Sequence, residues 1–338
     1  MPGLKTIYTR DGTPIADVKA SAVRSSLLNS YGEAVFFIAT TSIKCRKEIL
    51  NYGNYIVIQH DSLPDWVGIL DTPRPWHHGY VEVHAFEVPY ILQYRTTPLN
   101  AMLTGTPGEL FSQLLAIANG QDDTLLREGV VFSGGMVTDR QVNNSVYVHI
   151  KEIREQNNLD WACTPIVDGA GRLTVVFDLL ERAGVDTDLE LSQGHNILHG
   201  DMPLEESGEI INSVDAVTDG QEDGVLNFIY RDEQSIKEIG LRIVRESFSG
   251  ITDLPSLASV AKAFVDKRKI SSIATPLTAV NVGQTFSNIR NGNVASYRYT
   301  DVGFTDDRVG ISEKVRIQGW RYDETEDTCE LFTDKVVV

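Results

Sequence analysis

The strongest constraint on the fold is a segment whose side chains alternate between apolar and polar. Residues 80–87 read YVEVHAFE, which places Val81, Val83 and Ala85 on one face and polar residues on the other. A period of two residues is typical of a half-buried strand in an antiparallel sheet. Similar short runs of β-branched and aromatic residues, separated by Gly, Pro, Asn and Asp, lie at 34–39, 55–58 and 66–70. Four strands at this spacing predict a small barrel or sandwich, which we assign to residues 1–96.

A helix with a defined start follows this β-rich segment. Thr106 and Glu109 form a T-x-x-E capping box around Pro107, which predicts a helix over 107–119 that Gly120 ends. Its apolar stripe must face a core.

An α+β domain over 97–192 is completed by a second helix and a hairpin. The apolar spacing of Val146, Ile150 and Ile153 predicts the helix, over 146–157. The hairpin spans 161–178, with its turn in the string DGAG.

The last part of the chain returns to strands and is interrupted by helices. Strands are predicted near 210–217 and from 272 onward, and helices over 235–246 and 256–269. We therefore assign 193–220 and 272–338 to a second β domain and 221–271 to a helical insertion. The fold class is mainly β with α+β insertions.

The two β-rich parts echo each other weakly. The strings YGNYIVI and NGNVASY each place a Gly-Asn turn before a strand, with Gly53 and Gly292 in matching positions. Duplication is one interpretation. Chance similarity between two hairpins is the other.

The order of these features resembles the baseplate-hub and tail-associated-protein family of tailed phages and related contractile injection machines. The resemblance rests on K-x-x-L-x-x-G-x-x-I-x-I from Lys47, W-x-G-I from Trp66, S-I-x-x-I-G-x-R from Ser235 and VRIQGWRYD from Val315. Ile239 departs from it, because an aromatic residue is commoner there, and we expect no appended domain. The motif positions, including those of the echo, are Gly53, Trp66, Gly68, Ser235, Ile236, Gly240, Arg242, Gly292, Arg316, Gly319 and Trp320.

The resemblance implies an architecture and a set of partners. Hub proteins of this kind have two related β-barrels in each chain and form trimers, so three chains present six barrels. Implied partners are further copies of the chain, a distal tail ring or tail tube protein, a tape measure protein, and a central spike, fibre or lysin. The implied location is the tip or baseplate of a virion tail, assembled in the host cytoplasm, with DNA passing through during genome ejection.

The excess of acidic residues has two interpretations: it keeps the protein soluble, or it forms a surface that DNA passes without binding. Lys and Arg total 30 against 47 Asp and Glu, a net charge of −17, which disfavours stable contact with phosphate backbones. No apolar run approaches the roughly 20 residues that span a bilayer, and no secretory signal follows Lys5, so we expect no membrane anchor. Cys45, Cys163 and Cys329 show no metal or redox spacing and are expected to be free thiols.

Catalytic and cofactor motifs are missing from the sequence, so we expect no enzyme and no cofactor. His77, His78 and His84 could in principle bind a metal, but alternation places His84 opposite the apolar face and no carboxylate stands at clear ligand spacing. The acidic pairs at 122–123, 205–206 and 306–307 are expected to be solvated turns. Two alternative functions stay open: a carbohydrate-binding receptor protein, with its Trp residues as a stacking platform, and a tail-associated lysin.

Overall fold

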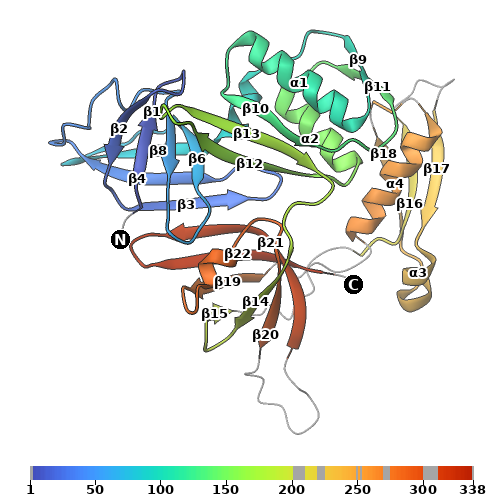
Figure 1. The fold of residues 1–338 in the computed structure, drawn as a ribbon. Coiled ribbons are helices and arrows are strands. Elements are labelled where there is room, and N and C mark those ends of the chain that lie inside the picture. The colour runs from blue at the N-terminus through green and yellow to red at the C-terminus, as the bar shows by residue number, and fades with distance from the viewer. Residues whose placement is uncertain are drawn as a thin grey trace, which may run out of the picture.

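A computed structural model describes residues 3–200, 210–218, 225–248, 250–251, 253–268, 275–299 and 311–336. Four units make up this part of the chain (Figure 1). A first β section leads into a middle α+β unit, and a second β section contains a smaller inserted unit. The fold is mainly β, as the sequence predicted.

The first β section is antiparallel. Its strands are β1 (Lys5–Tyr8), β2 (Pro14–Val18), β3 (Ala22–Leu27), β4 (Glu33–Ala39), β5 (Tyr55–Ile58), β6 (Trp66–Asp71), β7 (Trp76–His77) and β8 (Tyr80–Glu87). The main order is β3-β4-β8-β6-β5-β1-β2, and β7 pairs with β8 alone. The alternation predicted for β8 is confirmed, because Val81, Val83 and Ala85 are fully buried.

The middle unit packs two helices against a short mixed sheet. It contains η1 (Val88–Tyr94), β9 (Ala101–Gly105), α1 (Pro107–Gln121), β10 (Leu126–Val131), β11 (Thr138–Val142), α2 (Val146–Gln156), β12 (Asp160–Val167) and β13 (Leu173–Leu180). The predicted capping box of α1 is confirmed in both directions between Thr106 and Glu109. The helix passes Gly120 and ends two residues later than predicted, where Asp122 turns extended.

The second β section is built from strands that are far apart in the sequence. It contains β14 (Asp186–Ser192), β15 (Ile197–Gly200), β19 (Thr275–Val280), η2 (Thr285–Asn288), β20 (Val294–Tyr299), β21 (Ile311–Asp323) and β22 (Thr328–Lys335). The order is β15-β19-β22-β21-β20-β14. Strand β21 also pairs with β3, so both sections share one continuous sheet and one apolar core.

The inserted unit corrects two predictions. It contains β16 (Ser213–Thr218), β17 (Asn227–Arg231), α3 (Glu233–Ile239), β18 (Ile243–Phe248) and α4 (Leu254–Arg268), with the strands in the order β17-β16-β18. The strand predicted near 210–217 pairs here and not within the second β section. The helix predicted over 235–246 is wrong beyond Ile239, because Gly240 adopts a φ of 86° and the chain continues as β18.

This unit keeps its own sheet within the described residues, as expected, but it is not purely helical. Helix α4 covers one face of that sheet through Leu257, Ala261 and Val265. The unit lies beside α2 and β11 of the middle unit, at the right of Figure 1, instead of standing out from the second β section alone.

Corresponding strands follow the same order in the two β sections. Six strands of each section can be numbered along the chain if β2 and β7 are left out. Across the sheet, the order is then the second, third, sixth, fifth, fourth and first strand in both sections. The outermost ladder differs, because β1 is antiparallel to β5 whereas β14 is parallel to β20. Within the described residues neither section closes into a barrel, so the two predicted barrels are not confirmed.

The matching Gly-Asn turns have matching hydrogen bonds. The N–H groups of Gly53 and Gly292 donate to Leu70 O at 2.8 Å and Ile317 O at 2.7 Å. Asn54 O and Asn293 O accept from the same two partner residues, each at 2.8 Å. Each Asn side chain also donates to the carbonyl five residues earlier, at 3.1 and 2.9 Å. The weak sequence echo therefore marks two corners with the same backbone geometry.

These corners differ in the space around the glycine, and this difference generates a prediction. Both glycines have positive φ, 83° and 86°, but a Cβ on Gly53 would meet only the Arg10 side chain at 3.4 Å, whereas one on Gly292 would lie 2.3 Å from Ala183 O. We expect Gly53→Ala to lower the free energy of unfolding by about 1 kcal/mol and Gly292→Ala by about 3 kcal/mol. Urea unfolding of both variants measures this, and equal losses would contradict it.

Candidate functional site

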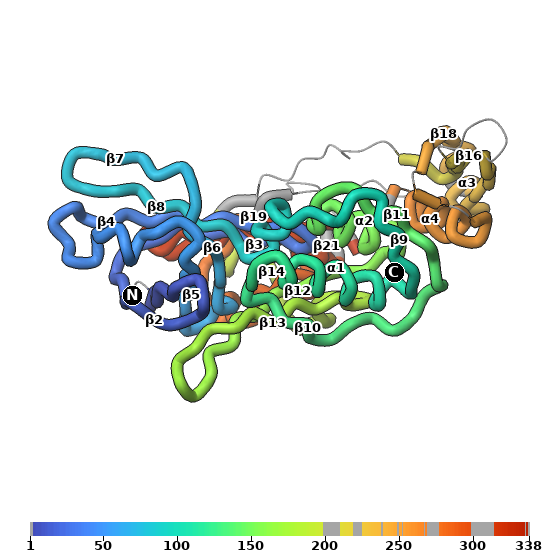
Figure 2. The backbone as a smooth tube through the Cα atoms, turned by 90° about the horizontal axis from the view of Figure 1, so that it is seen from above, coloured from blue at the N-terminus to red at the C-terminus, as the bar shows by residue number. Residues whose placement is uncertain are grey.

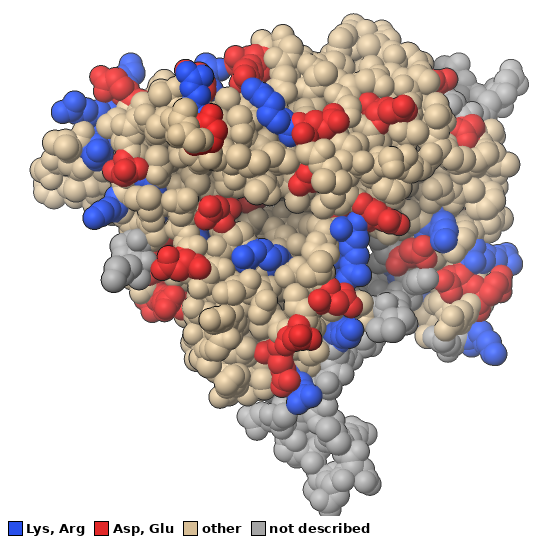
Figure 3. Space-filling model, in the orientation of Figure 1, with Lys and Arg blue, Asp and Glu red and all other residues tan. Residues whose placement is uncertain are grey.

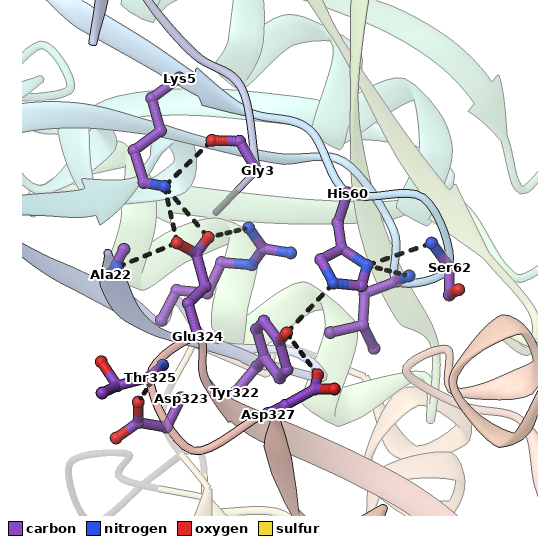
Figure 4. A network of polar contacts seen from close by, with 12 residues as sticks. Gly3, Lys5, Ala22, His60, Ser62, Tyr322, Asp323, Glu324, Thr325 and Asp327 are labelled. Atoms are coloured by element: carbon purple, nitrogen blue, oxygen red, sulfur yellow. Dashed lines mark hydrogen bonds and ion pairs between the residues drawn. The ribbon is translucent and has the colours of Figure 1, made fainter. Parts of the chain in front are cut away.

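A buried ionic cluster joins the two β sections (Figure 4). We call Lys5, Arg24 and Glu324 the ionic junction; they come from β1, β3 and the β21–β22 turn. Lys5 Nζ donates to Glu324 Oε2 at 2.8 Å and to Oε1 at 3.1 Å, and Arg24 Nη1 lies 3.5 Å from Oε1. The backbone N–H of Ala22 donates to the same carboxylate at 3.1 Å. The side chains of all three residues are at most 1% exposed.

The junction holds two cations against one carboxylate. Burial lowers the pKa of Lys5 and of Arg24, and Glu324 opposes this shift in both. The guanidinium of Arg24 lies 5.4 Å from the centre of the Tyr322 ring and 5.8 Å from that of Trp320, at cation–π range. Its Nε and Nη2 are buried and have no hydrogen-bond partner among the described residues. Glu324 is therefore the counter-charge that offsets the free-energy cost of burying both cations.

A chain of hydrogen bonds from Tyr322, whose ring lies beside Arg24, extends the junction to His60. His60 Nδ1 accepts from the backbone N–H groups of Ser62 and Leu63, each at 3.1 Å. That assignment leaves Nε2 to donate to Tyr322 Oη at 3.2 Å, and Tyr322 donates to Asp327 at 2.8 Å. Burial, and then the charge of Arg24, lower the pKa of His60. This chain of hydrogen bonds fixes the β21–β22 turn to the first β section.

A second network, around Asp160, joins three units. Arg316 Nη2 donates to Asp160 Oδ2 at 2.5 Å and to Ala183 O at 3.1 Å, and its Nε donates to Gly292 O at 3.2 Å. Asn29 Nδ2 donates to Asp160 Oδ1 at 2.7 Å. Arg316 and Asp160 thereby connect the second β section, the middle unit and the β3–β4 turn.

A cleft of about 320 Å³ opens beside the Asp160 network, and Ala183 is among the residues that line it. Figure 3 shows the surface hollowed between the upper units and the second β section below them. Trp66, Glu87, Trp161, Arg290 and Trp320 are among its lining residues. Glu87 Oε2 accepts from the backbone N–H of Gly32 at 2.6 Å, and burial raises the pKa of this carboxyl to about 7.

The motif positions lie in three parts of the structure: the corner turn at Gly53, the surroundings of the cleft, and the inserted unit. Gly53 lies in its corner turn, away from the cleft. Positions grouped around the cleft and the two networks are Trp66, Gly68, Gly292, Arg316, Gly319 and Trp320. The glycines there allow close approach, since a Cβ on Gly68 would lie 2.3 Å from the Trp66 ring and one on Gly319 would lie 2.7 Å from Leu27 Cδ2.

The remaining motif positions surround Asn212 in the inserted unit. Asn212 Nδ2 donates to Gly240 O at 2.7 Å and lies 3.4 Å from Ser235 Oγ, and its Oδ1 accepts from the N–H of Arg242 at 2.7 Å. Ile236 O accepts from the N–H of Gly240 and closes α3. The string from Ser235 to Arg242 therefore shapes the α3–β18 turn.

Sequence reasoning missed the ionic junction. The patterns described above assign no role to the side chains of Lys5, Arg24 or Glu324. The available signal was a basic residue within two short strands, KTIY and AVRSSL, that otherwise bury apolar side chains. Such a signal locates a buried cation without identifying its partner, which lies about 300 residues away.

The histidines are arranged differently from the expectation. Glu82 lies between two of them, with His84 Nε2 at 2.8 Å and His77 Nε2 at 3.2 Å from its two oxygens, and His84 Nδ1 is 2.5 Å from Glu33. A carboxylate therefore does stand within reach of both. Across the described ranges, no group of three or more His, Cys, Asp or Glu is placed to hold a metal ion.

Other candidate features are accounted for individually. Trp66, Trp161 and Trp320 are buried and only Trp76 is exposed, so they make no stacking platform together. Asp122 pairs with Arg10 and Arg95 whereas Asp123 pairs with Arg127, and the pairs at 205–206 and 306–307 lie outside the described residues. The three cysteines are free thiols. In the described part of the chain, no helix has the length and apolar character needed to cross a bilayer.

Solved structures share this fold over nearly the whole chain. A prophage tail protein from Listeria monocytogenes matches with a TM-score of 0.60 at 12% identity, covering 98% of this chain and 94% of that one. The 43 kDa tail protein of a Shewanella oneidensis prophage gives 0.61 at 11%, covering 98% of both chains. A tail protein from Neisseria meningitidis gives 0.61 at 14%, covering 98% and 96%.

A secretion protein extends the comparison beyond phages. A type VI secretion component from Escherichia coli, described as structurally similar to two T4 tail proteins, gives 0.54 at 9% identity, covering 94% of this chain and 73% of that one. No family model and no curated protein matches the sequence. The chain therefore has the fold of phage tail proteins, in agreement with the resemblance of its motifs.

The ionic junction generates a stability prediction. Replacing Glu324 with Gln keeps the shape but leaves Lys5 and Arg24 without a buried counter-charge, so we expect the free energy of unfolding to fall by about 3–5 kcal/mol. Glu326→Gln, on the exposed side of the same turn, is the matched control and should change stability little. Chemical denaturation of both variants decides the point, and a loss below about 1 kcal/mol for Glu324→Gln would count against it.

Glu87 generates a prediction about pH. Its pKa is about 7 in the folded chain against 4.5 for an ordinary Glu, so the folded state holds the proton more tightly. The stability it contributes is fully present below about pH 4.5 and is lost as the pH rises through 7. Glu87→Gln should remove this loss, and the stability difference between variant and wild type should shift by up to about 3 kcal/mol between pH 4 and pH 8. A difference independent of pH would contradict the assignment.

Proposed function

We propose that this protein is a non-enzymatic, trimeric hub at the tip or baseplate of a phage-type tail. It closes the tail tube and joins it to a distal ring and to a central spike, fibre or lysin. The proposal rests on one observation: two β sections in one chain share a strand order and a corner geometry. The fold shared with phage tail proteins supports it.

Pseudo-repetition supplies the physical reason for a trimer. A chain with two similar domains presents two similar surfaces, so three chains can match a partner of six-fold symmetry, such as a tail tube or distal ring. In this proposal the first barrel is the first β section, within 1–96, and the second is the second β section, built from β14, β15, β19, β20, β21 and β22. The inserted unit and the middle unit are attached to the ring of six barrels.

Charge supports a channel through which DNA passes without binding. Three chains of −17 carry a formal charge of −51, so the assembly repels phosphate backbones overall. The tape measure protein is the proposed occupant of the lumen before ejection. The proposed location is the virion, with assembly in the host cytoplasm.

Two alternative functions have less support. A carbohydrate-binding receptor needs exposed aromatic platforms, yet three of the four Trp residues are buried. A tail-associated lysin needs a hydrolase domain, and the fold shared with tail proteins already covers 98% of this chain. Glycan-array binding by the isolated chain would favour the first alternative, and clearing in a peptidoglycan zymogram would favour the second.

Oligomeric mass tests the proposal directly. Three chains of 37.5 kDa each give a particle of about 112 kDa, which light scattering or native mass spectrometry distinguishes from a monomer. Electron-microscopy class averages should show a ring with three-fold symmetry and six similar lobes. A strictly monomeric chain that also fails to add to tail tubes would rule the hub role out.

A further inference from the structure

One end of the molecule has a composition unlike the rest. Residues 40–54 and 71–80 form two neighbouring loops around β7, and we call them the basic tip. They hold Lys44, Arg46, Lys47 and Arg74 against Glu48 and Asp71, a formal charge of 4 − 2 = +2. The remaining chain therefore carries −17 − 2 = −19. The tip is cationic on a strongly acidic protein.

The tip also exposes large apolar side chains. Ile43 is 70% exposed and Trp76 69%, and Phe37 at the end of β4 is 49% exposed. Tyr80 shares one face of the β7–β8 hairpin with Phe37 and His77, in ring contact with both, at centroid distances of 5.4 and 4.7 Å. Trp76 stands opposite the buried Val81 and so belongs to the other face. Apolar side chains therefore project from both faces of the hairpin.

The two loops are held together before any partner binds. Thr40 N donates to Gly79 O at 3.0 Å and ties the β4 end to the β7–β8 turn. The Arg74 guanidinium lies 4.1 Å from the centre of the Tyr52 ring, which ties the hairpin to the end of the longer loop. A preorganised tip loses little conformational freedom when it docks.

The second β section has no counterpart of the hairpin at 71–80. The connection between β21 and β22, which corresponds to the one between β6 and β8, is a short turn that carries Glu324, Glu326 and Asp327. The hairpin at 71–80 is thus an addition to one β section, whereas residues 40–54 correspond to the β19–β20 connection, which ends in the matching Gly292 corner.

We infer that the basic tip docks on an anionic lipid surface, with Trp76 and Ile43 entering the interfacial layer. Trp and Tyr favour the membrane–water interface, and Lys and Arg beside them are attracted to anionic headgroups. Because apolar groups project from both faces, a surrounding interfacial layer can cover them, whereas a flat protein surface would cover only one. This is surface association and needs no spanning helix.

The acidic body does not prevent this contact. The hairpin lies at one end of the elongated molecule and the inserted unit at the other (Figure 2). Lys and Arg side chains are prominent at the tip end in Figure 3. At physiological salt, charges farther apart than about 8 Å are largely screened, so an anionic surface senses the tip more than the body.

Vesicle co-sedimentation of the full chain tests the inference. Vesicles of phosphatidylcholine and phosphatidylglycerol at 3:1 should bind the protein at low salt, pure phosphatidylcholine should not, and 0.5 M salt should release it. Trp76→Ala and the triple variant Lys44→Glu/Arg46→Glu/Lys47→Glu should each weaken binding by at least about tenfold. The control Lys151→Glu/Lys237→Glu/Lys262→Glu has the same change of charge at exposed positions elsewhere and should bind like the wild type.

Fluorescence reports on the tip itself. Since Trp66, Trp161 and Trp320 are at most 3% exposed, acrylamide quenches mainly the fluorescence of Trp76. The anionic vesicles should reduce this quenching. Equal binding to both vesicle types, unaltered binding by either tip variant, or binding to poly-glutamate without binding to vesicles would overturn the inference. None of these outcomes depends on whether the chain is a tail hub, which the oligomeric mass tests separately.

Discussion

The arrangement of the two β sections depends on one carboxylate. Glu324 takes two cations from the first β section out of water, and it can do so only when the β21–β22 turn lies against β1 and β3 in a single register. Removing three charges from water is costly. A shift in the pairing register between β3 and β21 would leave Lys5 or Arg24 buried without its counter-charge. The main effect of the junction is therefore to fix the register in which the two sections pair, and its contribution to net stability is smaller.

The shared strand order shows how one topology is kept by different sequences. The Gly-Asn corner recurs because a positive φ followed by a side-chain amide satisfies the same backbone groups in both sections. Elsewhere the sections diverge: β14 reverses the direction of the outermost ladder, the β6–β8 connection is extended into the hairpin of the basic tip, and the β15–β19 connection holds the inserted unit. Divergence is confined to edges and loops, where pairing constrains the chain least.

The polar networks lie at unit boundaries, which fits a structural role. Asp160 collects donors from three units, and Glu87 lies in the cleft between them with a raised pKa. Most of their hydrogen-bonding capacity is spent on backbone groups and arginines of neighbouring units, so the chemistry holds units together.

Local patterns in the sequence determined the local elements. The alternation at 80–87, the capping box at Thr106 and the DGAG turn depend on residues within a few positions of each other, and all three are found as predicted. Sheet membership depends on partners distant in sequence, which is why the sequence places the strand near 210–217 in the wrong sheet. The helix predicted from Ser235 is too long for a local reason, since Gly240 ends it. The ionic junction was decided by tertiary structure alone, because a buried charge is identified by the group that neutralises it, and Glu324 is about 300 residues from Arg24.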